Sequence, residues 1–210
     1  MTPAKPDDVS PATPDDVSPA EPDDVSPAEP DDVSPATPDD VSPADPNDIV
    51  LEGRRLSLRR ARDEDRDALG AILSEPEVVR WWGPFDPDTA FDEIDASFAI
   101  VIDGRVAGWL LYAEEDWWQY PSVAFDIALS TAAEGRGYGR EALRVAIRHF
   151  AARGHHRFTI DPSVDNERAI RSYAAVGFRE VGVLRSYERR DDAWHDGLLM
   201  DLLADELVEG

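Results

Sequence analysis

The chain has 210 residues, no cysteine and a formal net charge of −24, from 45 acidic and 21 basic residues. The lack of cysteine excludes disulfides, thiolate catalysis and zinc–cysteine sites, and the negative charge disfavours nucleic acid and anionic membranes as partners. The sequence shows no apolar signal core and no apolar run of membrane-spanning length, so we expect a cytoplasmic protein. The four histidines do not form a ligand-spaced set with carboxylates, so no metal is expected.

Residues 3–50 form six tandem octapeptides, from PAKPDDVS to a diverged PADPNDIV. Each repeat has two prolines, about two acids and one valine, so the segment buries too little apolar surface to offset the entropy lost on ordering. We therefore expect residues 1–50 to be a disordered acidic arm, which either keeps the protein soluble or docks to a basic partner. Residues 51–210 have the length of a single domain.

The negative charge is divided almost equally between the arm and the domain, and Lys5 is the only lysine, so every basic residue of the domain is arginine. An acidic domain attracts cationic ligands. The same composition also suits solubility or adaptation to high salt, and composition alone does not separate these alternatives.

The first half of the domain predicts two helices and four strands. Alternating residues predict a strand over 55–59, and apolar periodicity predicts helices over 63–75 and 86–96, with Trp81 and Trp82 in the loop between them. Asp103-Gly104 predicts a turn between strands over 98–102 and 106–112. An acidic, aromatic loop over 114–120 then leads into a strand over 122–129.

The second half begins with the segment EGRGYGREAL, residues 134–143, in which three glycines precede an amphipathic helix that runs to about residue 153. A strand over 158–161 and a helix over 166–176, which ends at Gly177, follow. Two strands, over 178–184 and 194–203, complete the chain. This order predicts one α+β or α/β domain with a mixed sheet.

The glycine-rich segment also predicts a phosphate site. Gly135, Gly137 and Gly139 allow backbone N–H groups to converge, and the start of a helix adds a partial positive charge at the same place. A glycine loop on its own is also an ordinary strand-to-helix turn. The prediction therefore depends on Asn166 and Tyr173, which follow on the next helix.

Four segments carry a resemblance to a known family: VVRWWG at 78–83, the pair Trp117-Trp118, AFD at 124–126, and TIDPSVDNERAIRSYAAVGF at 159–178. Over residues 53–204 the chain resembles the GNAT superfamily of acetyl-CoA-dependent N-acetyltransferases, and within it the aminoglycoside 6'-N-acetyltransferases. The resemblance implies a twisted, mostly antiparallel sheet flanked by helices, acetyl-CoA as co-substrate, and a role in antibiotic resistance.

The implied acceptor is a cationic small molecule, and the implied assembly is a monomer or a homodimer. Acetyltransferases of ribosomal-protein N-termini and of other small amines share most of the same features, so they remain an alternative. An acyl-CoA-binding module without enzymatic activity, in which the acidic arm is the active part, is a second one.

The resemblance implies a cofactor site on one strand, the glycine loop and the helix that begins at Asn166. The strand over 122–129 is expected to carry a bulge and to splay from the next strand, so that it pairs with the pantetheine arm and offers a backbone N–H to the oxyanion. Asn166 is expected to hydrogen-bond the arm, or else only to cap its helix. The expected cofactor-binding residues are Ile127, Ala128, Leu129, Arg136, Gly137, Tyr138, Gly139, Arg140 and Asn166.

One position departs from the family pattern. Glu134 stands where the phosphate loop usually has Gln or Arg, which places an anion beside an anionic cofactor. Either its side chain points away from the cofactor, or Arg136 and Arg140 outweigh it.

The catalytic residues implied by the resemblance are Asp126 and Tyr173. Asp126 interrupts the apolar run VAFDIAL, and an amine attacks only after losing its proton, so Asp126 is expected to act as the base. Tyr173 lies two helical turns after Asn166 and is expected to protonate the departing thiolate. The alternatives are an edge or outward-facing position for Asp126 and a Tyr173 that only packs in the core.

The acceptor is expected to lie among aromatic and acidic residues, because flat rings support sugars and cations and carboxylates attract ammonium groups. Each tryptophan pair has the alternative role of filling the core. The expected substrate-binding residues are Trp81, Trp82, Asp116, Trp117 and Asp126.

Overall fold

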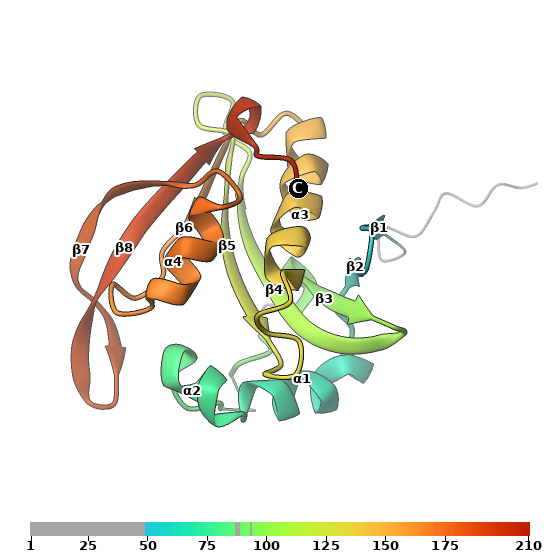
Figure 1. The fold of residues 1–210 in the computed structure, drawn as a ribbon, viewed down its shortest axis with the longest axis vertical. Coiled ribbons are helices and arrows are strands. Elements are labelled where there is room, and N and C mark those ends of the chain that lie inside the picture. The colour runs from blue at the N-terminus through green and yellow to red at the C-terminus, as the bar shows by residue number, and fades with distance from the viewer. Residues whose placement is uncertain (1–48, 87–88, 93) are drawn as a thin grey trace, which may run out of the picture. The chain divides into compact units, whose positions relative to one another are not determined.

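The computed structural model describes residues 49–86, 89–92 and 94–210 (Figure 1). The chain separates into two units, Met1–Ser42 and Pro43–Gly210. The expected disordered arm lies outside the described residues, apart from Ile49 and Val50. These last two residues of the sixth repeat belong to the folded unit, since Ile49 packs against the core and Val50 begins the first strand.

A single eight-stranded sheet forms the centre of this unit, in the order β1-β2-β3-β4-β5-β6-β8-β7. Among the described strands, β5 and β6 pair in parallel and all other neighbours are antiparallel. The sheet is therefore mixed and mostly antiparallel, as predicted. The strands are β1 (Val50–Glu52), β2 (Ser57–Arg60), β3 (Ser97–Ile102), β4 (Arg105–Glu115), β5 (Ser122–Leu129), β6 (Arg157–Ile160), β7 (Arg179–Arg190) and β8 (Ala193–Leu203).

Helices cover both faces of the sheet (Figure 1). On one face, α3 (Tyr138–Ala152) and α4 (Glu167–Ala174) pack over a core that includes the rings of three phenylalanines on β3, β5 and β6. On the other face, α1 (Arg66–Leu73) and α2 (Pro76–Trp82) cover a smaller core around Trp109 of β4. Neighbouring residues of a strand point to opposite faces, so β4 supplies side chains to both cores. No helix in the described part of the chain is both long and apolar enough to cross a membrane.

Two segments between β2 and β3 differ from the sequence prediction. The tryptophan pair does not lie in a loop but forms the last turn of α2, which has Pro76 in its first turn, where the missing N–H costs nothing, and ends at Gly83 with φ 77°. The helix predicted over 86–96 is wrong for its described residues, which form turns and a 3-10 turn at Ile94–Ala96. Its two large apolar side chains, Phe91 and Ile94, are buried beside Trp109 without a longer helix.

The β7–β8 hairpin is longer than the strands predicted over 178–184 and 194–203. Asp191 and Asp192 both have positive φ, at 51° and 58°, which suits the tight two-residue connection between the strands. The register shifts between Leu184 and Glu188, where Ser186 has φ 49°. A bulge of this kind bends a strand and redirects its side chains. Here Tyr187 and Glu188, which follow the bulge, face the cavity described below.

Candidate active site

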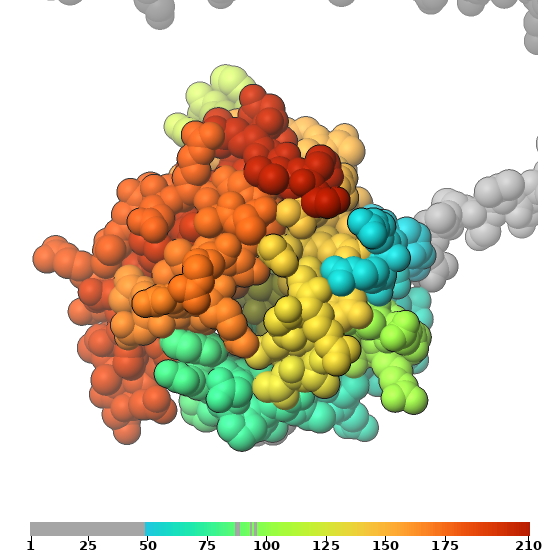
Figure 2. Space-filling view, in the orientation of Figure 1, coloured from blue at the N-terminus to red at the C-terminus, as the bar shows by residue number. Residues whose placement is uncertain are grey.

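A cavity of about 840 Å³ lies at the carboxyl end of β5. It is bounded by the glycine loop before α3, by α4, by α2 and by the β7–β8 hairpin. Figure 2 shows the surface hollowed between α4 and the glycine loop. The glycine-loop side of the cavity presents glycines and the start of α3, together with Glu134, while the side formed by α2 and the hairpin presents acids and aromatic rings. This division suits two different ligands that meet in the middle.

The strands β5 and β6 separate inside the cavity. Their parallel pairing ends at Ala124 and Thr159, although β5 continues to Leu129. The edge of β5 over residues 125–129 is therefore open to an extended, amide-bearing ligand such as a pantetheine arm. Ile127, Ala128 and Leu129, which were predicted to bind the cofactor, line the cavity. The predicted bulge is wrong, because the β4–β5 register is continuous from Gly108↔Leu129 to Glu115↔Ser122.

The glycine loop has the backbone of an anion cradle. Gly135 and Gly137 have φ of 71° and 84°, a region that glycine enters without strain, and Gly137 is the N-cap of α3. The first N–H groups of α3 are free of helical partners and point out of its N-terminus, which fits a diphosphate. The predicted residues that line the cavity here are Gly137, Tyr138, Gly139 and Arg140. Arg136 was also predicted, but it lies on the outside of the loop, where its carbonyl accepts a hydrogen bond from Arg55 Nη1 (2.9 Å).

Glu134, which stands where the family pattern has Gln or Arg, is paired with an arginine that the sequence did not indicate. The two oxygens of Glu134 accept hydrogen bonds from both terminal nitrogens of Arg168, with Nη2 to Oε1 at 2.7 Å. Arg168 belongs to α4, so the pair joins the glycine loop to the opposite side of the cavity. The charge of Glu134 is therefore paired with Arg168, which lies outside the loop, and not with Arg136 or Arg140.

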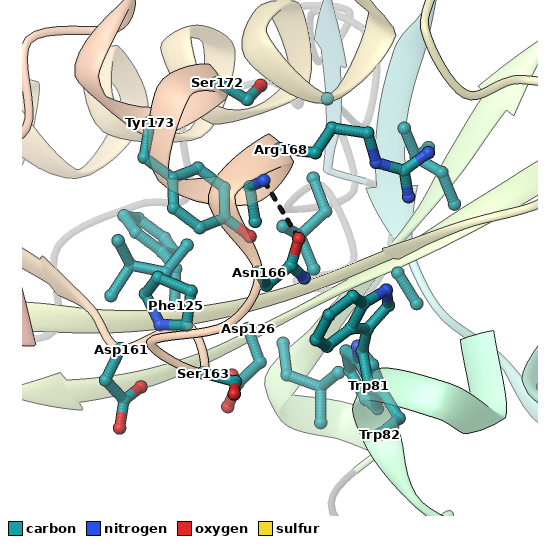
Figure 3. A pocket seen from close by; sticks show the side chains of 18 of the residues that line it. Trp81, Trp82, Phe125, Asp126, Asp161, Ser163, Asn166, Arg168, Ser172 and Tyr173 are labelled. Carbon is teal, nitrogen blue, oxygen red and sulfur yellow. Dashed lines mark hydrogen bonds between the residues drawn. The ribbon is translucent and has the colours of Figure 1, made fainter. Parts of the chain in front are cut away.

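Asn166 lines the cavity and also caps α4. Its side-chain oxygen accepts a hydrogen bond from the N–H of Ala169 at 3.1 Å (Figure 3). Asn166 is therefore the N-cap of α4. Capping uses only the oxygen, so the amide nitrogen remains as a donor for a ligand in the cavity.

Asp126 faces the cavity from the same side of β5 as Ala124 and Ala128. Its side chain is exposed to the open cavity, while protein atoms crowd around its carboxylate. The partial desolvation by these atoms, with the negative charges of Asp161 and Glu188, raises the pKa of Asp126 from its ordinary 3.8 to about 6. A carboxylate with such a pKa accepts a proton well at neutral pH. Asp126 therefore lies on the unpaired edge of β5 with an exposed side chain, and the space it faces is the cavity.

Tyr173 reaches the cavity from α4. Its ring contacts Phe178 edge-on, with centroids 6.3 Å apart, and its hydroxyl points into the cavity (Figure 3). Burial, together with the charges of Asp126 and Asp161, raises the pKa of Tyr173 above its ordinary value. The phenol therefore stays protonated at neutral pH and acts as a donor. The Tyr173 ring thus packs against Phe178, while its hydroxyl is available in the cavity.

The predicted acceptor residues are only partly brought together. Trp81 and Trp82 line the cavity, and Trp82 also stacks on Trp109, with centroids 6.3 Å apart. Asp116 and Trp117 do not line it, so their assignment to this site is wrong. They follow β4 and precede β5, at the end of the sheet opposite to the cavity, where Asp116 Oδ1 lies 3.1 Å from His155 Nε2.

Several acidic and aromatic residues of the cavity were missed in the sequence. Asp161 stands in the DPS string but was not assigned a role, and its hydrogen bond with Tyr187 raises the pKa of that phenol to about 12. Tyr187 and Glu188 reach the cavity through the bulge in β7, which no local pattern announces. Glu77 lines the cavity from α2.

The hairpin that carries these residues is tied to α2 by an arginine. Arg190 is buried, donates a hydrogen bond from Nη1 to the carbonyl of Arg80, and lies over the Trp81 ring at 5.8 Å. Its Nε also lies 3.4 Å from Glu188. These contacts fix the hairpin beside the tryptophans, so the acidic and aromatic walls form one continuous surface.

The position of Asp126 predicts a cost in stability. Its pKa is higher in the folded protein than in the unfolded chain, so ionisation of Asp126 destabilises the fold, fully above about pH 6 and not at all below 3.8. Asp126→Asn should therefore raise the melting temperature at about pH 7.5 and give a smaller gain at about pH 4.5. Thermal unfolding at both pH values measures this. A melting temperature of Asp126→Asn below that of the natural protein at about pH 7.5 would contradict this prediction.

Comparison with known proteins agrees with this geometry. The profile of the acetyltransferase (GNAT) domain family matches residues 55–179. The uncharacterized N-acetyltransferase YoaA of Bacillus subtilis is 25% identical over 163 residues, which cover 70% of this chain and 92% of YoaA.

Solved structures show the same fold. RimJ of Mycobacterium smegmatis, in complex with CoA-disulfide, aligns with a TM-score of 0.68 and 24% identity over 78% of this chain and 91% of RimJ. The ribosomal-protein-S5-alanine acetyltransferase of Vibrio fischeri aligns with a TM-score of 0.64 and 18% identity over 77% of this chain and all of that one. With the profile match over more than half of its length, the chain belongs to the GNAT family of acetyltransferases.

Proposed function

We propose that the protein transfers the acetyl group of acetyl-CoA to a primary amine of a polycationic small molecule, with the 6'-amine of aminoglycosides as the leading acceptor. One observation carries the proposal. At the end of the open edge of β5, Asp126 faces a cavity whose acceptor side is acidic and aromatic and whose other side is an anion cradle.

The residues present fit acetyl-CoA, which supplies an activated thioester when bound. The N–H groups at the start of α3 hold its diphosphate, and the open edge of β5 holds its pantetheine amides. This places the thioester beside Asp126, where backbone N–H groups of Ile127 or Ala128 stabilise the developing oxyanion.

The chemical step is a direct transfer between the two substrates. Asp126 takes a proton from the ammonium group, directly or through water, so that the neutral amine attacks the thioester carbon. The C–S bond then breaks, and the Tyr173 hydroxyl donates a proton to the leaving sulfur. No acyl-enzyme on cysteine is formed, since the chain has no cysteine.

Charge supports a cationic acceptor. Burial raises the pKa of Asp126, and the negative charges of Asp161 and Glu188 raise it further; an ammonium group beside Asp126 would relieve this repulsion. Two arginines that line the cavity are already paired with other carboxylates, Arg168 with Glu134 and Arg171 with Glu167. Trp81 and Trp82 provide flat surfaces beside the acids for sugar rings.

A second candidate acceptor is a protein N-terminus. It is favoured by two similar solved structures whose names describe such activities, a ribosomal L7/L12 alpha-N-protein acetyltransferase and the ribosomal-protein-S5-alanine acetyltransferase. Both are less than 25% identical to this chain, so they speak for the fold rather than for the substrate. The α-amine of a peptide would use the same base and the same oxyanion donor.

A release assay for the free thiol of CoA tests both candidates. We expect turnover with kanamycin and tobramycin and none with an aminoglycoside that has a 6'-hydroxyl in place of the amine. A basic peptide and a peptide with an N-terminal alanine serve as the alternative acceptors. Turnover with the peptides and none with the aminoglycosides would show that the acceptor is a protein N-terminus and not an aminoglycoside.

A further inference from the structure

We infer that Arg168 is a positioning residue for the cofactor, and that its task is to mask the charge of Glu134 at the diphosphate cradle. This inference deepens the proposed function and rests on its cofactor site. It explains how a glycine loop that begins with an acid can still bind an anionic carrier.

The pair lies at the cofactor end of the cavity. Glu134 directly precedes Gly135, the first glycine of the loop, and both line the cavity with Arg168. In Figure 3 the guanidinium of Arg168 extends from α4 away from Tyr173 and Asp161. Arg168 is therefore placed to act on cofactor binding.

The geometry of the pair is that of a charge mask. Both oxygens of Glu134 accept from the two terminal nitrogens of Arg168, which is the fork-to-fork arrangement that arginine makes best with a carboxylate. The Glu134 side chain is only 20% exposed, so water screens it little and the guanidinium supplies most of its neutralisation. The loop arginines do not replace it, since no hydrogen bond or ion pair joins Arg136 or Arg140 to Glu134 in the described structure.

A purely structural role is the competing explanation. The pair joins the loop to α4, and α4 has no fully buried residue, so the pair could serve only to hold this helix in place. The two explanations make opposite predictions for Glu134. If the pair is only a link, removing either partner is equally harmful. If Arg168 masks a charge, removing Glu134 also removes the need for the mask.

The test is a double-mutant cycle on the full-length protein, with CoA as the probe in isothermal titration calorimetry. We expect Arg168→Gln to weaken CoA binding by about tenfold or more, because it leaves an unpaired carboxylate next to the diphosphate. Glu134→Gln should bind CoA as tightly as the natural protein or more tightly. The double variant should recover to within about threefold of the natural protein.

Two controls separate the mask from general effects. Arg179→Gln removes an exposed guanidinium that is paired with Glu206 and does not line the cavity, so we expect less than about a threefold change. The loss in Arg168→Gln should also shrink as salt is raised, because dissolved ions screen part of the repulsion between Glu134 and the diphosphate. In turnover assays, Arg168→Gln should raise KM for acetyl-CoA and leave kcat within about threefold. Melting temperatures show that each variant is folded.

The results that overturn the inference are distinct from those that overturn the proposed function. If the double variant binds CoA as poorly as Arg168→Gln, the pair is a link and the mask is wrong. The same holds if Glu134→Gln weakens binding as much as Arg168→Gln does. If the natural, folded protein gives no heat with CoA, the cofactor site itself is wrong, and the inference falls with it.

Discussion

Asp126→Asn should lower kcat/KM for the amine acceptor by about 10²- to 10⁴-fold, the range that general-base catalysis supplies. Asparagine has nearly the same shape and fills the same place on β5, but it cannot accept the proton of the ammonium group. Binding of CoA should change by less than about twofold, because the diphosphate cradle and the open strand edge are made of backbone. Steady-state kinetics with a saturating donor, together with calorimetry, measure the two effects separately.

The pH profile identifies the base more sharply than the rate alone. The raised pKa of Asp126 means that its carboxylate forms only above about pH 6, so kcat/KM of the natural protein should fall as the pH drops through that value. In Asp126→Asn this acidic limb should be absent, and only the titration of the amine should remain. Unchanged turnover, or a limb near pH 6 that persists in the variant, would remove Asp126 from this role.

Tyr173→Phe should lower kcat by about 10²-fold with little change in KM for either substrate. The ring keeps its contact with Phe178, so folding and cofactor binding should be preserved, and only the proton for the leaving sulfur is lost. Burial and the charges of Asp126 and Asp161 raise the pKa of Tyr173, so its phenol is protonated and has a proton to donate. A cationic acceptor would offset both carboxylates and make the phenol a better acid.

Tyr187→Phe is the matched control for this variant. Tyr187 lies in the same cavity but on β7, and its hydroxyl bonds to Asp161 instead of facing the thioester. We expect it to raise KM for the amine more than it lowers kcat. If Tyr173→Phe keeps full turnover at saturation, the Tyr173 hydroxyl is not the donor and the residue serves only in packing.

The order of elements followed from the sequence because their signals are local. Period-2 and period-3.6 apolar patterns, an Asp-Gly turn and a glycine after the last helix were enough to predict the mixed sheet and three of its helices. The segment around Phe91 and Ile94 misled for the same reason. Its two apolar residues have helical spacing, but burial against Trp109 requires only a short turn, and tertiary packing overrides a weak local preference.

The cavity residues of the glycine loop and β5 were predictable, while half of the residues predicted for the acceptor do not reach the cavity. The glycine loop and β5 are each continuous in sequence, so their residues were found together. Asp116 and Trp117 have the right chemistry, but the direction of β5 puts their loop at the far end of the sheet. Aromatic and acidic composition does not tell at which end of a strand a loop lies.

The sequence by itself determined the glycine loop, the acid within β5 and the helix with Asn166 and Tyr173, because each depends on neighbours within a few residues. Only the tertiary structure decided that Arg168 pairs with Glu134, and that Tyr187 and Glu188 enter the cavity. These contacts join residues far apart in the chain, and they depend on strand register, on a bulge and on where two separate elements meet. No local pattern carries such information, because it arises when the sheet is assembled.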